Sequence, residues 1–358
     1  MLMQWGHLWR WVRAGAVIGI VWMLYLAMRS SWAPFDPLSP TKNWNSGQIS
    51  RHDSCRRHGW KSFKPASEDT PRKVYDLIMV NTELDWLEIR LNSTWHAVDY
   101  YVLVEAARTF TNLQKPLVLQ DNMARFEPYR SKIIYHEVAF PPGFVAHRTW
   151  DIEDLQRNAM LTQVFPKLAG AQAPTYGDVI VVSDVDEVPR PVTYAVLRDC
   201  WFPRRLTLRS SFYYYSFQYL HRGEEWGHPQ ATYYQGSRTV LPNDLRVGDG
   251  AWPFKWLDQG SLANAAWHCS SCFATVDELL TKLSSFAHVS MNADEFRDRR
   301  RIADRVRNGR DLWDRPGELY DRIDDNKDVP SFLLDNRERF RYLLDRDGPT
   351  AGFSDYED

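Results

Sequence analysis

Three carboxylates follow a short apolar run near the middle of the chain. Ser183-Asp184-Val185-Asp186-Glu187 comes directly after Val179-Ile180-Val181-Val182. Carboxylates this close together repel one another unless a hard cation neutralises them. In an extended segment Asp184 and Asp186 point to the same side and can hold one Mn²⁺ or Mg²⁺ ion. Such an ion can bridge a diphosphate and stabilise the charge of a leaving group, so the motif predicts a metal site.

The acidic motif suits more than one kind of chemistry. In a metal-dependent phosphatase the first aspartate is a nucleophile, and a small residue and a threonine usually follow the motif. Here Glu187-Val188-Pro189 follows instead, which favours transfer from a nucleotide sugar, with the metal holding the diphosphate. A glycan-binding module without catalysis is a third interpretation, and the intact pair of Asp184 and Asp186 argues against it.

Two further pairs of residues are candidates for the same site. Glu225 and Asp249 lie in an aromatic region after the motif, and either could be the base that deprotonates an acceptor hydroxyl. His268 and His288 could bind the metal or the diphosphate, because neutral imidazole ligates Mn²⁺ and imidazolium pairs with phosphate. The alternative for the acids is a surface charge, and for each histidine a structural role.

Apolar runs and helical periodicities that could position these residues alternate along residues 72–347. The predicted strands cover residues 74–80, 100–105, 115–119, 133–135 and 178–183; the predicted helices cover 83–95, 154–168, 276–287, 294–307 and 337–344. This order predicts one α/β domain with a mostly parallel sheet, followed by a C-terminal tail at 348–358. Ligands of such sheets bind beyond the C-terminal strand ends. Glu83 and Asp85 follow the first strand, where a nucleotide donor could lie, although helix-surface charges explain them equally well.

The N-terminal residues have the composition of a membrane anchor. Residues 14–28 are uncharged and mostly apolar, Arg10 and Arg13 precede them and Arg29 follows, so the predicted anchor covers residues 14–29. The positive-inside rule then makes residues 1–13 a cytosolic tail and places the rest of the chain in the lumen. Residues 30–71 are rich in proline and polar residues, which is typical of a stem. A cleaved signal peptide and a buried helix remain alternatives.

The cysteines and one sequon fit a luminal compartment. Cys55, Cys200, Cys269 and Cys272 can form two disulfides in an oxidising environment, with three connectivities open. The spacing of the last two also occurs in metal knuckles, which need a second pair. Asn92-Ser93-Thr94 is an N-glycosylation sequon.

Charge and composition exclude some functional classes. The 44 Lys and Arg residues nearly balance the 46 Asp and Glu residues, giving a formal net charge of −2. No bulk basic field therefore draws nucleic acid to the chain. Aromatic residues are abundant, at 14%, and aromatic faces suit sugar rings as well as protein cores.

Several motifs occur in the order seen in a known family. They are Tyr75-Asp76, Glu83-Leu84-Asp85, Val98-Asp99-Tyr100, Thr109-Phe110-Thr111, Glu153-Asp154 with Arg157, Ser183-Asp184-Val185-Asp186-Glu187-Val188-Pro189, Trp267-His268-Cys269-Ser270-Ser271-Cys272-Phe273, and Lys282-Leu283 with Phe286-Ala287-His288. Together they resemble glycosyltransferase family 17 over about residues 55–345, and Cys55 with His58-Gly59-Trp60-Lys61 resembles its plant and fungal branch. Three positions depart from the family pattern: Thr82, Ala266 and Ser271, the last of which stands where an aromatic residue is usual.

The resemblance implies a GT-A-like fold and an inverting transfer of GlcNAc from UDP-GlcNAc to a mannose of an N-glycan on a glycoprotein, in β-1,4 linkage. A divalent cation, Mn²⁺ or Mg²⁺, would be bound directly by Asp186. Asp184 would be a second ligand or a ribose contact, and Glu187 would orient the metal loop. A single-pass type II protein of the Golgi membrane is the expected setting.

Overall fold

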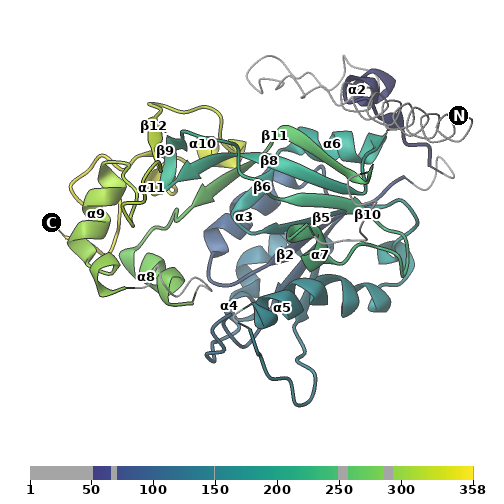
Figure 1. The fold of residues 1–358 in the computed structure, drawn as a ribbon, viewed down its shortest axis with the longest axis horizontal. Coiled ribbons are helices and arrows are strands. Elements are labelled where there is room, and N and C mark those ends of the chain that lie inside the picture. Colours follow the sequence, from purple (N-terminus) through teal and green to yellow (C-terminus); the bar gives the residue numbers. More distant parts are fainter. Residues whose placement is uncertain (1–50, 66–70, 149, 249–256, 286–292, 358) are drawn as a thin grey trace, which may run out of the picture.

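The computed structural model describes residues 51–65, 71–148, 150–248, 257–285 and 293–357. These residues form a ten-stranded sheet with helices on both faces (Figure 1). The predicted cytosolic tail at 1–13 and the predicted anchor at 14–29 lie outside the described residues. Within the described part of the chain, no helix is long and apolar enough to cross a bilayer.

Four neighbouring parallel strands form the first half of the sheet. They are, in spatial order, β5 (Val179–Asp184), β2 (Val74–Met79), β3 (Tyr100–Glu105) and β4 (Ile133–Glu137). Their continuous apolar runs follow from burial on both faces of the sheet, where neither side of the pleat meets water. All four coincide with predicted strands to within a few residues.

Two helices cover the opposite faces of these strands. Helix α3 (Leu84–Thr94) shares a buried cluster with Ile78, and α5 (Asp151–Thr162) shares another with Leu77. Successive side chains of a strand point to opposite faces. Neighbouring residues of each strand therefore belong to different clusters, one on each face of the sheet. This packing makes the C-terminal ends of β2 and β5 a rigid edge.

The second half of the sheet is antiparallel except for one pair of strands, β8 (Arg205–Tyr214) and β11 (Gln259–Ser270). Strand β10 (Gln230–Tyr233) pairs with β5, and β8, β9 (Ser216–His221) and β12 (Tyr320–Arg322) continue the sheet. The expectation of a mostly parallel sheet is therefore wrong for this half. Only one residue links β8 to β9, which is too short for the crossover that a parallel pair requires.

A long-range pairing brings the late part of the chain to the acidic motif. Strand β6 (Glu187–Pro189) begins within the motif and pairs antiparallel with β11 (Gln259–Ser270), with His268 opposite Glu187. Strand β11 also runs parallel to β8. The imidazole therefore reaches the carboxylates through sheet register.

The N-terminal segment of the described chain is fastened to the domain by a disulfide. Helix α2 (Arg51–Arg57) carries Cys55, which is bonded to Cys200, and β1 (Lys61–Ser62) pairs with β7 (Cys200–Trp201) after α6 (Pro191–Asp199). Residues 51–62 thus belong to the folded domain, which corrects the predicted stem boundary at residue 71.

The C-terminal residues also belong to the domain. Ala351 and Phe353 are buried in a cluster with α8 (Val276–Ser285) and α9 (Arg299–Arg307), and Asp355 accepts the first amide hydrogens of α8. The predicted tail at 348–358 is therefore packed rather than separate over its described residues. Helices α10 (Ser331–Asp335) and α11 (Arg341–Leu344) precede it.

One predicted strand is absent from this described region. Residues 115–119 lead into the short helix α4 (Val118–Asp121), whose Leu119 and Gln120 amides donate to the buried carboxylate of Glu105. Capping by this carboxylate outweighs the local β-propensity. Helix α7 (Pro242–Arg246) packs against α5 beside β5, the strand at which the parallel half of the sheet ends.

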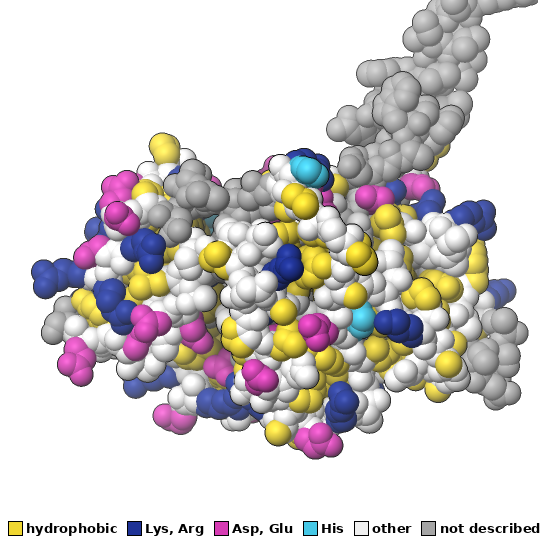
Figure 2. Space-filling model, turned by 90° about the horizontal axis from the view of Figure 1, so that it is seen from below, with side chains coloured by type: hydrophobic (Ala, Val, Ile, Leu, Met, Phe, Trp, Pro, Cys, Tyr) yellow, Lys and Arg dark blue, Asp and Glu magenta, His cyan; other side chains and the backbone are white. Residues whose placement is uncertain are grey.

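Charged side chains of both signs are mixed on the face seen in Figure 2. Lys and Arg lie among Asp and Glu, and neither sign forms a continuous field there. This distribution agrees with the nearly balanced composition of the chain.

Candidate active site

The acidic motif lies where the sheet changes from parallel to antiparallel pairing. Asp184 ends β5, whose neighbours are parallel β2 on one side and antiparallel β10 on the other. The C-terminal ends of parallel strands open a crevice at such a switch point. The carboxylates are therefore at the place where α/β sheets usually bind their ligands.

A buried arginine holds the backbone of the motif. Arg90 of α3 forms an ion pair with Asp76 of β2 at 2.7 Å, and both side chains are fully buried. The same guanidinium donates to the carbonyl oxygens of Asp184 at 3.0 Å and Glu187 at 2.7 Å, and to the hydroxyl of Ser183. Removing Arg90 would leave a buried carboxylate unpaired, so its role is structural.

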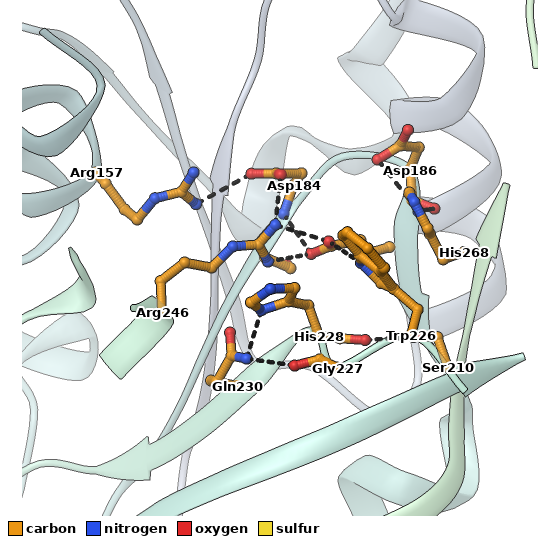
Figure 3. Close-up of polar contacts among 12 residues, drawn as sticks. Arg157, Asp184, Asp186, Ser210, Trp226, Gly227, His228, Gln230, Arg246 and His268 are labelled. Carbon is orange, nitrogen blue, oxygen red and sulfur yellow. Dashed lines mark hydrogen bonds and ion pairs between the residues drawn. The ribbon is translucent and has the colours of Figure 1, made fainter. Parts of the chain in front are cut away.

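Two more arginines pair with the side chain of Asp184 (Figure 3). Arg157 of α5 contacts one carboxylate oxygen at 3.0 Å, and Arg246 of α7 contacts the other at 2.7 Å. Burial by itself raises the pKa of Asp184, but the charges of Arg246 and Arg157 outweigh it and lower that pKa. Asp184 is thus an ionised carboxylate with both oxygens committed to guanidinium groups.

Glu187 connects this ion pair to the aromatic part of the site. Its side chain is fully buried and binds Arg246 at 2.5 Å, the indole N–H of Trp226 at 2.8 Å, and the amide of Asp184 at 3.0 Å. Burial opposes ionisation, yet the Arg246 charge and hydrogen bond bring the pKa of Glu187 well below its usual value. We refer to Asp184, Glu187, Arg157 and Arg246 as the guanidinium cluster.

Asp186 has quite different neighbours. One carboxylate oxygen lies 3.7 Å from Nδ1 of His268, and the other lies 3.8 Å from Nζ of Lys282 on α8. The His268 ring packs against both Phe212 and Trp226, with ring centroids 5.2 and 5.1 Å away. These rings fix the imidazole beside Asp186, whose own contacts are longer than those in the guanidinium cluster.

Two pockets meet at the motif. The first, which we call the sheet-edge pocket, is bordered by residues that follow β2 and β5 and has four cationic side chains: Arg108, Lys115, Arg157 and Lys282. The second, the aromatic pocket, has a volume of about 380 Å³ and is bordered by Phe212, Tyr214, Trp226 and Trp313. Asp184, Asp186 and Lys282 border both. One ligand can therefore extend from the strand ends, across the motif, into the aromatic pocket.

The whole-chain match decides the family. A sequence profile of glycosyltransferase family 17 matches residues 18–348. This chain belongs to glycosyltransferase family 17. Membership identifies a glycosyltransferase, and a crevice at the strand ends beside a second pocket suits an enzyme that joins two substrates.

The relatives of this family 17 chain include mammalian enzymes. Beta-1,4-mannosyl-glycoprotein 4-beta-N-acetylglucosaminyltransferase from Homo sapiens is 28% identical over 312 residues, which is 77% of this chain and 56% of the human protein. The Rattus norvegicus enzyme is 27% identical and covers 77% and 55%. This chain spans about half the length of the curated relatives it matches.

Two enzymes of known structure show weaker similarity to this chain. A mannosyltransferase from Pyrobaculum calidifontis, solved with GDP-Man and Mn²⁺, is 11% identical and covers 79% of this chain and 73% of its own, with a TM-score of 0.30. Glucosyl-3-phosphoglycerate synthase from Mycobacterium tuberculosis, solved with UDP, is 14% identical and covers 40% and 45%, with a TM-score of 0.24. Both scores are low, and neither match defines the fold or the ligand of this family 17 chain.

Two of the predicted donor-binding residues, Glu83 and Asp85, lie in different surroundings in the structure. Glu83 borders the sheet-edge pocket. Burial raises the pKa of its carboxyl group and the charge of Asp186 raises it further, which together outweigh the lowering effect of Lys282. Asp85 borders neither of the described pockets. Its carboxylate binds Arg125 and the hydroxyl of Tyr342, because two residues along a helix turn it by about 200° from Glu83 to another side of α3. The assignment of Asp85 to the donor site is therefore corrected.

The candidate bases and late metal ligands are only partly described. Glu225 borders the aromatic pocket, and its Oε1 accepts the amide hydrogen of Asn264 at 2.7 Å. His268 borders the same pocket. Asp249 and His288 lie outside the described residues, and their predicted roles stay predictions.

The second disulfide and the sequon are also placed. Cys269 is bonded to Cys272, so the connectivity is Cys55–Cys200 and Cys269–Cys272. Ser271, between the bonded cysteines, borders the aromatic pocket. Asn92 is exposed on α3 with its amide 3.3 Å from the hydroxyl of Tyr129, and its glycosylation stays a prediction.

The side chains at the motif offer a small donor set for a divalent cation. Among the described residues, no three His, Cys, Asp or Glu side chains are grouped to hold a metal ion. Both oxygens of Asp184 are paired with arginine. Asp186 and His268 remain adjacent, one carboxylate and one imidazole, and Mn²⁺ accepts both ligand types. These two side chains fit a cation whose remaining ligands come from substrate and water.

Two important residues of the site were not foreseen. Arg246 stands in a polar segment without a distinctive pattern, and Trp226 resembles the other aromatic residues around it. Both contact Glu187 across sequence separations of 59 and 39 residues. Only Arg157 had a local signal, since it follows Glu153 by one helical turn and pairs with it at 2.6 Å.

Proposed function

We propose that this chain is an inverting glycosyltransferase that moves GlcNAc from UDP-GlcNAc to a mannose of an N-glycan in β-1,4 linkage. The observation that carries the proposal is the junction of two chemically different pockets at Asp186. Family membership and the activity named for its mammalian relatives support the choice of donor and acceptor.

The sheet-edge pocket suits the nucleotide part of the donor. It lies at the strand ends and has four cationic side chains, which favour a diphosphate. Asp186 and His268 would hold a divalent cation, Mn²⁺ or Mg²⁺, which would neutralise charge on the leaving diphosphate. The guanidinium cluster and Arg90 keep the loop that carries Asp186 in place.

The aromatic pocket suits a neutral sugar acceptor. Phe212, Tyr214 and Trp313 offer apolar ring faces, against which the C–H face of a pyranose can pack. Glu225 borders this pocket with its Oε2 not used in the bond to Asn264. We assign Glu225 as the general base that accepts the proton of the attacking hydroxyl.

The transfer step balances with these groups. The acceptor oxygen forms a bond to C1 of GlcNAc on the face opposite the diphosphate, and the C1–O bond to the β-phosphate breaks. Its electron pair stays on the β-phosphate oxygen of UDP, and the acceptor proton goes to Glu225. The configuration at C1 inverts because attack and departure occur on opposite faces.

We further propose that the enzyme works in the Golgi as a single-pass type II membrane protein, with residues 14–29 as the anchor. The glycoprotein acceptor would be luminal. Two disulfides join the four cysteines, which supports an oxidising compartment.

The full chain, solubilised in detergent, tests the proposed reaction. UDP or GDP release is measured with a panel of nucleotide sugars, an N-glycan acceptor mixture, and either Mn²⁺ or EDTA. We expect Mn²⁺-dependent release from UDP-GlcNAc that requires acceptor, and a product whose new linkage is β-1,4 by NMR. Turnover of another donor would overturn the GlcNAc assignment, and absence of turnover and of UDP binding would overturn the transferase proposal.

A further inference from the structure

We propose that Lys282 binds the β-phosphate of the donor and stabilises the charge that develops when the glycosidic bond to UDP breaks. This inference rests on the proposed function. It adds a residue of the chain itself to the groups that hold the diphosphate.

The position of Lys282 is the first support. Of the cationic side chains in the described residues, it is the one that borders both the sheet-edge pocket and the aromatic pocket at Asp186. Its Nζ lies 3.8 Å from Asp186, and its side chain is 27% exposed. A donor lying across the motif places its β-phosphate between nucleotide and sugar, which is where the two pockets meet.

The commitments of the other cations are the second support. Arg157 pairs with Glu153 at 2.6 Å and with Asp184 at 3.0 Å, and Arg246 pairs with Glu187 at 2.5 Å. These guanidinium groups neutralise protein carboxylates. The distance of 3.8 Å between Nζ of Lys282 and Asp186 is longer than any of these three contacts.

The chemistry of lysine is the third support. A compact ammonium on a four-carbon stem is a point charge that follows a phosphate oxygen as its charge grows. Before the donor binds, Lys282 lies 3.8 Å from the carboxylate of Asp186 and borders the sheet-edge pocket together with Glu83. After C1–O cleavage the electron pair rests on the β-phosphate oxygen, beside the Lys282 side chain.

The test compares nucleotides that differ by the β-phosphate. Isothermal titration measures UDP and UMP affinity for the wild type and for Lys282→Met, which keeps length and removes charge, in Mn²⁺ and in EDTA. We expect Lys282→Met to weaken UDP binding about tenfold, the value of one charge-assisted contact, and UMP binding less than twofold. Lys282→Arg keeps most of the UDP affinity.

Controls separate this role from a structural one. Lys327, which pairs with Asp325 on the surface at 2.6 Å, provides the matched variant Lys327→Met, which should bind both nucleotides as the wild type does. Equal losses of UDP and UMP affinity, or unchanged UDP affinity, in Lys282→Met would overturn the inference while wild-type turnover of UDP-GlcNAc leaves the proposed function intact. A wild-type chain that binds no nucleotide would overturn both.

Discussion

The sheet-edge pocket and the aromatic pocket share Asp184, Asp186 and Lys282 but have different walls. The first lies at the ends of β2 and β5 and has four cationic side chains beside four carboxylates, whereas the second lies against β8 and β11 and has aromatic rings. In the proposed reaction the first takes the diphosphate with its cation and the second takes the neutral sugar. The contrast teaches that different strands of one sheet supply the two halves of the site.

The same contrast runs through the two aspartates. Asp184 is held by Arg157 and Arg246 at hydrogen-bond distance, whereas the carboxylate of Asp186 lies 3.7 Å from His268 and 3.8 Å from Lys282. We infer that Asp184 organises the loop and that Asp186 meets the ligand.

The largest effect is expected where the pockets meet. Asp186→Asn keeps the side-chain shape and removes the charge that faces the donor, so UDP-GlcNAc turnover should fall about 1,000-fold, the scale of a lost metal or diphosphate contact. Initial rates of UDP release at saturating substrates measure it, and UDP binding should lose its dependence on Mn²⁺.

Asp85→Asn is the matched control for Asp186→Asn. It makes the same chemical change in a charge cluster that borders neither described pocket, so turnover should stay within about threefold of the wild type, a change below 1 kcal/mol. Similar losses in the two variants would remove the distinction between the site and that cluster.

The second effect tests the connection between the pockets. Arg246→Met leaves fully buried Glu187 without its cation, which should lower the free energy of unfolding by about 3 kcal/mol. Urea denaturation measures this loss. UDP affinity and acceptor KM should both worsen, because Glu187 holds Trp226 as well as the motif.

Arg246→Lys sharpens the same test. Lysine restores one charge but not the fork that contacts two carboxylates, so its stability should lie between those of the wild type and Arg246→Met. If Arg246→Met unfolds at the wild-type urea concentration, the guanidinium cluster does not support the site.

The third effect is confined to the aromatic pocket. Glu225→Gln removes the proposed base, so kcat should fall about 100-fold, within the range of general-base catalysis. UDP affinity should not change, because the base faces the acceptor. Glu224→Gln, at a side chain that is 94% exposed, is the neighbouring control, and a parallel loss of UDP affinity in Glu225→Gln would refute the separation of the two pockets.

The smallest effect is a pH dependence of stability. Burial and the charge of Arg246 lower the pKa of His228 from 6.5. A folded-state pKa below the unfolded value gives stability that is present above pH 6.5 and is lost as pH falls toward the folded pKa. Asp184 and Glu187 act in the same direction, starting near their unfolded pKa values of 3.8 and 4.5.

Urea midpoints at pH 7.5, 6.5 and 5.5 measure this dependence. His228→Asn removes the imidazole and should flatten the fall in stability between pH 6.5 and 5.5. An unchanged slope in His228→Asn would show that protonation of His228 does not limit stability.

Local pattern predicted the elements with strong burial signals. The runs at Val74–Met79 and Val179–Asp184 were recognised as strands because burial on both faces demands apolar side chains throughout. The strand predicted at 115–119 is wrong, because the helix that begins there is capped by Glu105, which lies fourteen residues before Leu119. Asp85 misled as well, because it follows Glu83 by only two residues yet lies on another side of α3, away from the pocket that Glu83 borders.

The sequence by itself determined the family, the strand that ends in Ser183-Asp184-Val185-Asp186-Glu187, and the chemistry that such a cluster can support. Only the tertiary structure decided which aspartate is paired with arginine and which lies beside His268 and Lys282. The reason is physical: periodicity and residue type report local burial, whereas the partners of Asp184, Glu187 and His268 arrive from α5, α7 and β11 through packing and strand register.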